Sequence, residues 1–131
     1  MSMITSFGPA AFDVTLGSTT LNHCIQLTAT ATSGEFTMAV ARRAGTTCSG
    51  ADFKDVATVT LDSNNNITSV TFTDRWGGHG WGSMSGSFGT TTGSGSINTN
   101  DDPRTTNGSW SAGGTGIPFP QTHGAGHGQH A

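Results

Sequence analysis

The feature that most constrains the fold is a two-residue alternation of apolar and polar side chains that recurs along the chain. Residues 12–16 and 36–41 place Phe, Val, Leu or Met at every second position, and in residues 21–32 Leu21, Ile25 and Leu27 occupy odd positions, as a strand with one buried face requires. No window of about a dozen residues carries apolar groups at helical spacing without Gly or β-branched interruption. The sequence therefore predicts an all-β protein.

A hairpin gives the clearest local prediction. Within residues 56–74, Val59 and Leu61 alternate with threonines, as do Val70 and Phe72, and the polar segment 62–66 between them contains three consecutive asparagines. Asn tolerates positive φ and closes turns with its own side chain. Ile67 and Val70 break the alternation, which predicts a bulge or a late start to the second strand.

Further short strands are expected over residues 83–96 and 107–111, with a turn at Ser33–Gly34. The 83–96 segment is so rich in glycine that it would form stable strands only where two backbones approach closely. Seven or eight strands with turns every 8–12 residues predict one antiparallel β-sandwich or β-barrel over residues 1–112. The pattern does not choose between the two. Residues 113–131 contain Gly, Pro and His without periodicity, so we expect an irregular tail there.

Composition excludes several classes of protein. The 131 residues, enough for one domain, include only five Lys and Arg and carry a net charge of -3, whereas a nucleic-acid binder needs a basic cluster. No run approaches 18 apolar residues, so no membrane span is expected. Gly, Thr and Ser supply 57 of the residues, so hydroxyl and backbone groups provide most of the polarity.

The densest cluster of functional side chains lies in residues 74–82. It contains Asp74, Arg75, Trp76, His79 and Trp81, separated by four glycines. Flat aromatic faces beside charged groups suit a sugar ring, which stacks on the first and hydrogen-bonds to the second. This predicts a lectin-like, carbohydrate-binding site. The alternative is that both tryptophans plug the end of a small β core, with the glycines making room.

Two other patterns indicate a binding site less strongly. The threonines of 28–32, 58–60 and 71–73 repeat at spacing two, so each set lies on one strand face. Such rows could bind a polymer surface, or simply form the wet face of a sheet. In the tail, His123, His127 and His130 have a spacing that would bind a metal on a helix, but the intervening glycines disfavour a helix. No metal or other cofactor is therefore expected.

An enzyme is the less favoured class. His79 with Asp74 could form a general base and its orienting group, with Ser83 as nucleophile. No serine lies in a nucleophile elbow, however, and tyrosine is absent from the chain.

The two cysteines bear on the compartment. Paired, Cys24 and Cys48 would close a loop of about 25 residues and stabilise the fold by about 3.5 kcal/mol; unpaired, they would be two small buried thiols. Residues 1–9 show no basic or long apolar segment of the kind found in signal peptides. An extracellular, virion or surface-associated location is the expectation, without a visible export signal.

Two functional hypotheses follow from these observations. The first is a non-catalytic binding module for a glycan or another small polar ligand. The second is a self-assembling structural subunit of a virion, filament or coat, because low charge and thin Gly/Ser/Thr strands suit a protein stabilised by its neighbours.

Overall fold

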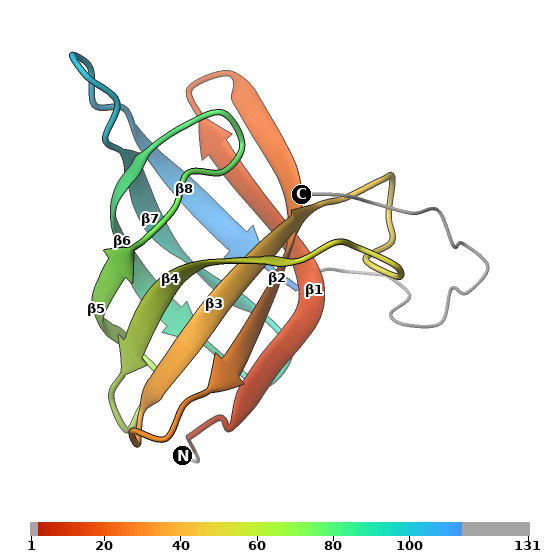
Figure 1. Cartoon of the computed structure of the whole chain (residues 1–131), viewed down its shortest axis with the longest axis vertical. Helices are drawn as coiled ribbons and strands as arrows, with labels where there is room; N and C mark the ends of the chain where they lie inside the picture. The colour runs from red at the N-terminus through yellow and green to blue at the C-terminus, as the bar shows by residue number, and fades with distance from the viewer. Residues whose placement is uncertain (1–2, 114–131) are drawn as a thin grey trace.

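The computed structural model of the chain describes residues 3–113, which form eight β-strands and no helix (Figure 1). The all-β prediction is confirmed. The strands are β1 (Ser6–Leu16), β2 (Thr19–Ala29), β3 (Glu35–Arg42), β4 (Lys54–Leu61), β5 (Ile67–Phe72), β6 (Trp81–Phe88), β7 (Gly93–Thr99) and β8 (Asn107–Ala112). Residues 3–113 contain no helix that is long and apolar enough to cross a membrane.

The strands form one antiparallel sheet that curls into a nearly closed barrel. Their order is β5-β4-β3-β2-β1-β8-β7-β6, so β1 pairs with β8 and nearly every strand lies beside its neighbour in sequence. The ladder is interrupted between β5 and β6, where an isolated bridge joins Asn66 to Ser87. The structure thus resolves the choice that the sequence left open in favour of a barrel over a sandwich.

The interior of the barrel is filled by the predicted apolar faces. Phe12, Val14, Ile25, Met38 and Val40 are all completely buried. A continuous column of aromatic rings runs through this core, with successive ring centroids 4.3–5.9 Å apart, in the order Phe7, Phe88, Trp110, Phe12, Trp76 and Trp81. Because the column occupies the interior, a ligand has room only near an end of the barrel or on its outer surface.

The β4–β5 hairpin forms as predicted. Asn65, with φ of 64°, is the one non-glycine residue with positive φ in residues 3–113. Asp62 closes the turn by accepting hydrogen bonds from the Asn64 and Asn66 amides. The expected irregularity is present as a register shift between Thr60 and Leu61.

Strand β1 begins earlier than the alternation indicates. It starts at Ser6, and the register shifts between Phe7 and Ala10, around Gly8 and Pro9. Proline lacks the backbone N–H that a regular β-ladder needs, so in the sequence Pro9 reads as the end of a strand. In the structure, β1 pairs with β2 on both sides of it.

The long connections gather at one end of the barrel, which we call the loop end. They are the β3–β4, β5–β6 and β7–β8 loops, and the tight β1–β2 turn lies at the same end (Figure 1). In the β3–β4 loop Cys48 forms a disulfide with Cys24 of β2. The bond is surrounded by Ala41, Ala51 and Phe53, so it attaches this loop to the barrel wall.

Candidate ligand site at the loop end

The β5–β6 loop folds back over the loop end through a tight turn. The backbone groups of Trp76 and His79 hydrogen-bond to each other in both directions. The two residues between them, Gly77 and Gly78, have φ values of 62° and 83°. Two successive positive φ angles are typical of a type I′ turn, and glycine adopts them without steric cost. The glycines therefore fix where the neighbouring aromatic side chains lie.

Both tryptophans of the predicted cluster lie in the core. Trp76 and Trp81 are only 6% and 5% exposed, and their rings stack with centroids 4.3 Å apart. The Trp81 indole N–H donates to the Trp76 carbonyl oxygen at 3.0 Å. Of the two alternatives, plugging the end of the core is the role this geometry shows. Neither indole presents an open face for stacking a sugar.

The charged members of the cluster lie outside this plug and have ionic partners. Asp74 lies 3.4 Å from the Lys54 ammonium group. His79 contacts Asp101, with 2.6 Å between Nδ1 and Oδ2, so the carboxylate that orients this imidazole is Asp101, not Asp74. Arg75 lies 3.6 Å from the same carboxylate of Asp101.

Asp101 joins two loops. Besides binding His79, it accepts a 2.8 Å hydrogen bond from the Gly80 amide. The His79 hydrogen bond is the largest cause that holds the pKa of Asp101 below its usual value, followed by the Gly80 amide. The carboxylate thus stays ionised and links the β5–β6 loop to the β7–β8 loop.

Three residues at this end were not found from the sequence as parts of a site: His23, Lys54 and Asp101. They come from β2, β4 and the β7–β8 loop, so only the closure of the sheet brings them near residues 74–81. A histidine at an inward position of a strand was the one available signal, because polar groups in a core need a reason to be there.

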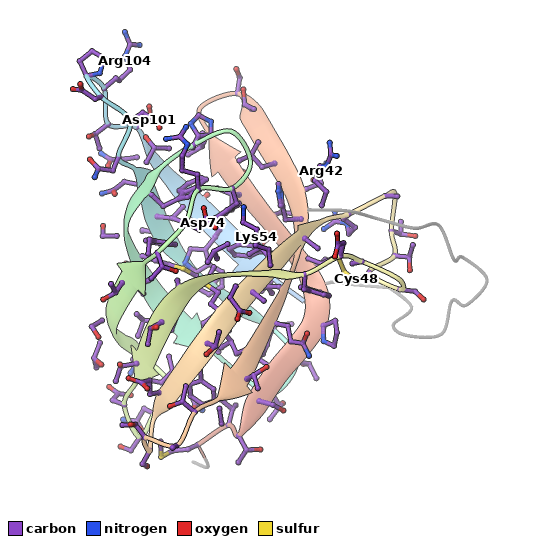
Figure 2. The ribbon with its side chains drawn as sticks, viewed as in Figure 1. Arg42, Cys48, Lys54, Asp74, Asp101 and Arg104 are labelled. Atoms are coloured by element: carbon purple, nitrogen blue, oxygen red, sulfur yellow. A yellow bond between two sulfur atoms is a disulfide. The ribbon has the colours of Figure 1, made fainter. Side chains whose placement is uncertain are left out.

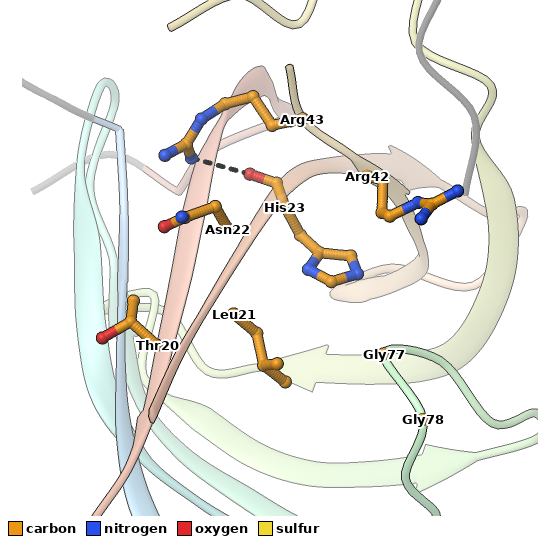
Figure 3. Close-up of a pocket in the computed structure, with 8 residues that line it drawn as sticks. All are labelled: Thr20, Leu21, Asn22, His23, Arg42, Arg43, Gly77 and Gly78. Carbon is orange, nitrogen blue, oxygen red and sulfur yellow. Dashed lines mark hydrogen bonds between the residues drawn. The ribbon is translucent and has the colours of Figure 1, made fainter. Parts of the chain in front are cut away.

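Two neighbouring depressions at the loop end share His23 and Gly77 as wall residues. The larger, of about 670 Å³, is open and also includes Arg42 and Arg43 in its lining (Figure 3). The smaller, of about 300 Å³, lies on the Trp76 side, where Asp52, Phe53 and Lys54 contribute. Figure 3 shows the His23 ring between Leu21 and Arg42, facing the Gly77–Gly78 turn.

His23 is a buried histidine with an altered titration. It is 5% exposed, and burial, followed by the positive charges of Arg42 and Arg43, lowers its pKa from 6.5 to about 4. The imidazole is therefore neutral near pH 7, with one ring nitrogen able to donate a hydrogen bond and the other to accept. Its edge packs against Trp76, with ring centroids 5.2 Å apart.

Charge is concentrated at the loop end. All five Lys and Arg of the chain lie there, at strand ends or in loops. Five of the eight carboxylates accompany them: Asp52, Asp55, Asp74, Asp101 and Asp102. Figure 2 shows Arg42, Lys54, Asp74, Asp101 and Arg104 in the same half of the barrel. The opposite end has short turns and two acidic residues, Glu35 and Asp62.

The threonine sets lie on the outside of the barrel, and the register connects them across strands. Thr28 pairs with Thr37, Thr37 with Thr58, and Thr58 with Thr71. These four residues are half-buried or exposed. They form one transverse row on β2 to β5, which sequence spacing alone could not reveal.

The metal-site candidates His123, His127 and His130 lie outside the described residues. Within residues 3–113 no group of three or more His, Cys, Asp or Glu side chains is placed to hold a metal ion. Searches of protein-family models, curated proteins and solved structures find no match to this chain.

Proposed function

We propose that this protein is a non-catalytic binding module whose polar ligand, of the carbohydrate class, binds at the loop end of the barrel. The observation that carries the proposal is the gathering of every Lys and Arg at the end that also has the long loops and two adjoining depressions. The stability of the fold does not require this concentration of charge at one end, because exposed ion pairs contribute little to stability.

The pairing of these charges favours recognition over catalysis. Lys54 with Asp74, and Arg75 with Asp101, offer donors and acceptors side by side. Such pairs can bind hydroxyl groups, which both donate and accept, through charge-assisted hydrogen bonds. Recognition would then proceed through hydrogen bonds to loop side chains, without sugar stacking on Trp76 or Trp81.

The disulfide supports a place of action in an oxidising compartment. Disulfides persist outside the cytosol and are rare within it, so the Cys24–Cys48 bond fits the extracellular or surface-associated location expected from the sequence.

A glycan array probed with the full chain tests the proposal, followed by titration calorimetry of any glycan that binds. Asp74→Asn and Arg75→Gln should each weaken binding, because both side chains are exposed and contribute to the loop end. Glu35→Gln, which removes a carboxylate at the opposite end, is the matched control and should leave affinity unchanged. The absence of binding to any glycan would overturn the proposal.

A second candidate function, self-assembly, is favoured by the gap between β5 and β6. Both strands have backbone groups along this gap that the sheet does not pair, apart from the contacts around Asn66 and Ser87. Unpaired edges are templates for adding a strand from another molecule. Light scattering behind a sizing column at two concentrations tests this function. A particle that grows with concentration would support it, and a constant monomer mass would exclude it.

A further inference from the structure

A second, smaller apolar cluster lies on the outside of the barrel. Cys24 of β2 and Ala41 of β3 are register partners, and both alternate with core residues of their strands, so their side chains point outward. They are nevertheless fully buried, because Cys48, Ala51 and Phe53 of the β3–β4 loop pack against them. This loop is therefore folded onto the outer wall of the barrel.

An open groove of about 520 Å³ lies between this loop and β1. Its walls are the Gly8–Pro9 segment of β1, Gln26 of β2, and loop residues 48–51 with Phe53, none of which is charged. Pro9 is exposed and Phe53 is half-buried, so residues 3–113 leave both rings partly uncovered. Such a groove suits an uncharged, apolar partner, because a charged one would lose hydration without gaining an ionic partner.

The last described residue lies beside one wall of this groove. The Gly113 amide donates a 2.8 Å hydrogen bond to the Ala11 carbonyl oxygen, one position beyond the last β1–β8 register pair, Phe12 with Ala112. Gly113 has φ of 88°, so β8 ends here. Ala11 is two residues from Pro9, about 7 Å along an extended strand. The chain therefore continues from a point close to the groove.

The residues that follow have a composition that matches the groove. After Gly-Thr-Gly comes the run Ile117-Pro118-Phe119-Pro120, and residues 114–131 contain no other apolar side chain larger than alanine and no Asp, Glu, Lys or Arg. A residue that precedes proline is restricted to extended conformations. A segment of this kind loses less entropy on binding, which is one reason why proline-rich segments dock in grooves lined by aromatic rings.

Chain length favours this segment over the same segment of another molecule. The four residues from Gly113 to Ile117 span up to about 14 Å, which exceeds the distance from Ala11 to Pro9, so the run can reach the groove while β8 stays paired. A short tether gives an effective concentration of about 1 mM. A second copy of the chain at micromolar concentration would compete poorly with it.

We propose that residues 117–120 bind in the groove between β1 and the β3–β4 loop, with Ile117 and Phe119 against the rings of Pro9 and Phe53. The segment then holds the β3–β4 loop against β1, in addition to the Cys24–Cys48 disulfide. The groove shares one wall residue, Phe53, with the smaller loop-end depression and none with the larger. The proposal therefore does not depend on ligand binding at the loop end.

The test is nuclear Overhauser spectroscopy of the full chain labelled with 13C and 15N. Protons of the Phe119 ring should show contacts with those of Pro9 and Phe53. A mixture of labelled and unlabelled chain, with isotope filtering, separates contacts within one molecule from contacts between two. Contacts seen only between molecules would overturn the assignment to the chain's own segment. The absence of any contact between Phe119 and the groove would overturn the proposal altogether.

Substitutions on both sides of the contact give a second readout. Phe119→Ser should move the amide signals of Gly50 and Ala51 and lower the bound-to-free ratio of the segment roughly 10-fold, the effect of losing part of a buried phenylalanine ring. Thr122→Ala changes the same part of the chain outside the apolar run and is the matched control. Ser49→Glu places a charge in the groove wall and should abolish the contacts of Phe119.

The control decides whether the effect is specific. Gly50 and Ala51 signals that move with Phe119→Ser and stay in place with Thr122→Ala would support the proposal. Signals that are unchanged in Phe119→Ser, or that move equally in both variants, would overturn it. If Ser49→Glu fails to fold, the comparison of Phe119→Ser with Thr122→Ala still decides, because both substitutions lie outside the barrel strands.

Discussion

Gly86 and Gly95 face each other across the β6–β7 pair so closely that a Cβ atom on either would lie 2.7 Å from the Cα of the other. A Cβ on Gly95 would also overlap the carbonyl oxygen of Ser85. That oxygen accepts the Trp110 indole N–H. The glycines of this thin segment therefore allow a close backbone contact next to the aromatic column.

Gly95→Ala should consequently destabilise the barrel strongly. Because the obstacle is backbone and not a flexible side chain, we expect a loss of about 3 kcal/mol in the free energy of unfolding, measured by urea denaturation. Gly89→Ala is the control, since a Cβ there would approach only the Thr92 oxygen, at 3.3 Å, and its effect should be well under 1 kcal/mol. Equal losses in both variants would contradict this account.

The disulfide should contribute measurably to stability. Cys24 and Cys48 are 24 residues apart in the chain, and closing such a loop stabilises the folded state by about 3.5 kcal/mol in the chain-entropy estimate. Reduction should lower the thermal midpoint by about 10 °C or more. The double variant Cys24→Ala/Cys48→Ala should unfold at the lower temperature with or without reductant. A midpoint insensitive to reductant in the wild-type protein would show that the bond does not stabilise it.

Strand alternation predicted most of the barrel because it reports a local property, burial of one strand face. The faces of 12–16 and 36–40 point inward as expected. The candidate site was predictable only in part, because its partners are distant in sequence. Asp101 reaches His79 across 22 positions, and His23 meets Trp76 through ring packing. The sequence pattern of 74–82 could not show whether the indoles face solvent, since that depends on how the loop folds over the barrel.

Stability should depend on pH through His23. Its pKa is about 4 in the folded protein and 6.5 in the unfolded chain, so the unfolded state takes up the proton first as pH falls. The stabilisation is fully present above pH 6.5 and is lost as pH falls toward 4, by at most about 3 kcal/mol. Chemical denaturation at a series of pH values measures this loss. His23→Gln should flatten the curve in that window, and an unchanged slope would contradict the assignment to His23.

The Asp101 link should control the opening of the β5–β6 loop. Asp101→Asn removes the charge that binds Arg75 and His79, and it weakens the acceptor of the Gly80 amide. Hydrogen exchange at the Gly80 amide should therefore accelerate. Asp74→Asn is the control, because its carboxylate bonds to the Arg75 amide instead. Gly80 exchange that is equally fast in both variants would show that Asp101 does not hold the loop.

The Gly77–Gly78 turn offers a comparison between two positions with the same backbone requirement and different surroundings. Alanine at either should cost about 1–2 kcal/mol, because both have positive φ. A Cβ on Gly78 meets nothing within 4 Å, whereas on Gly77 it lies 3.1 Å from Leu21 Cδ1 and 3.4 Å from His23 Cε1. Gly77→Ala should therefore be less stable than Gly78→Ala by about 1 kcal/mol in thermal and urea unfolding. It should also weaken sugar binding more than Gly78→Ala, because it displaces the His23 ring. Equal stability and equal affinity in the two variants would mean that this turn does not position His23.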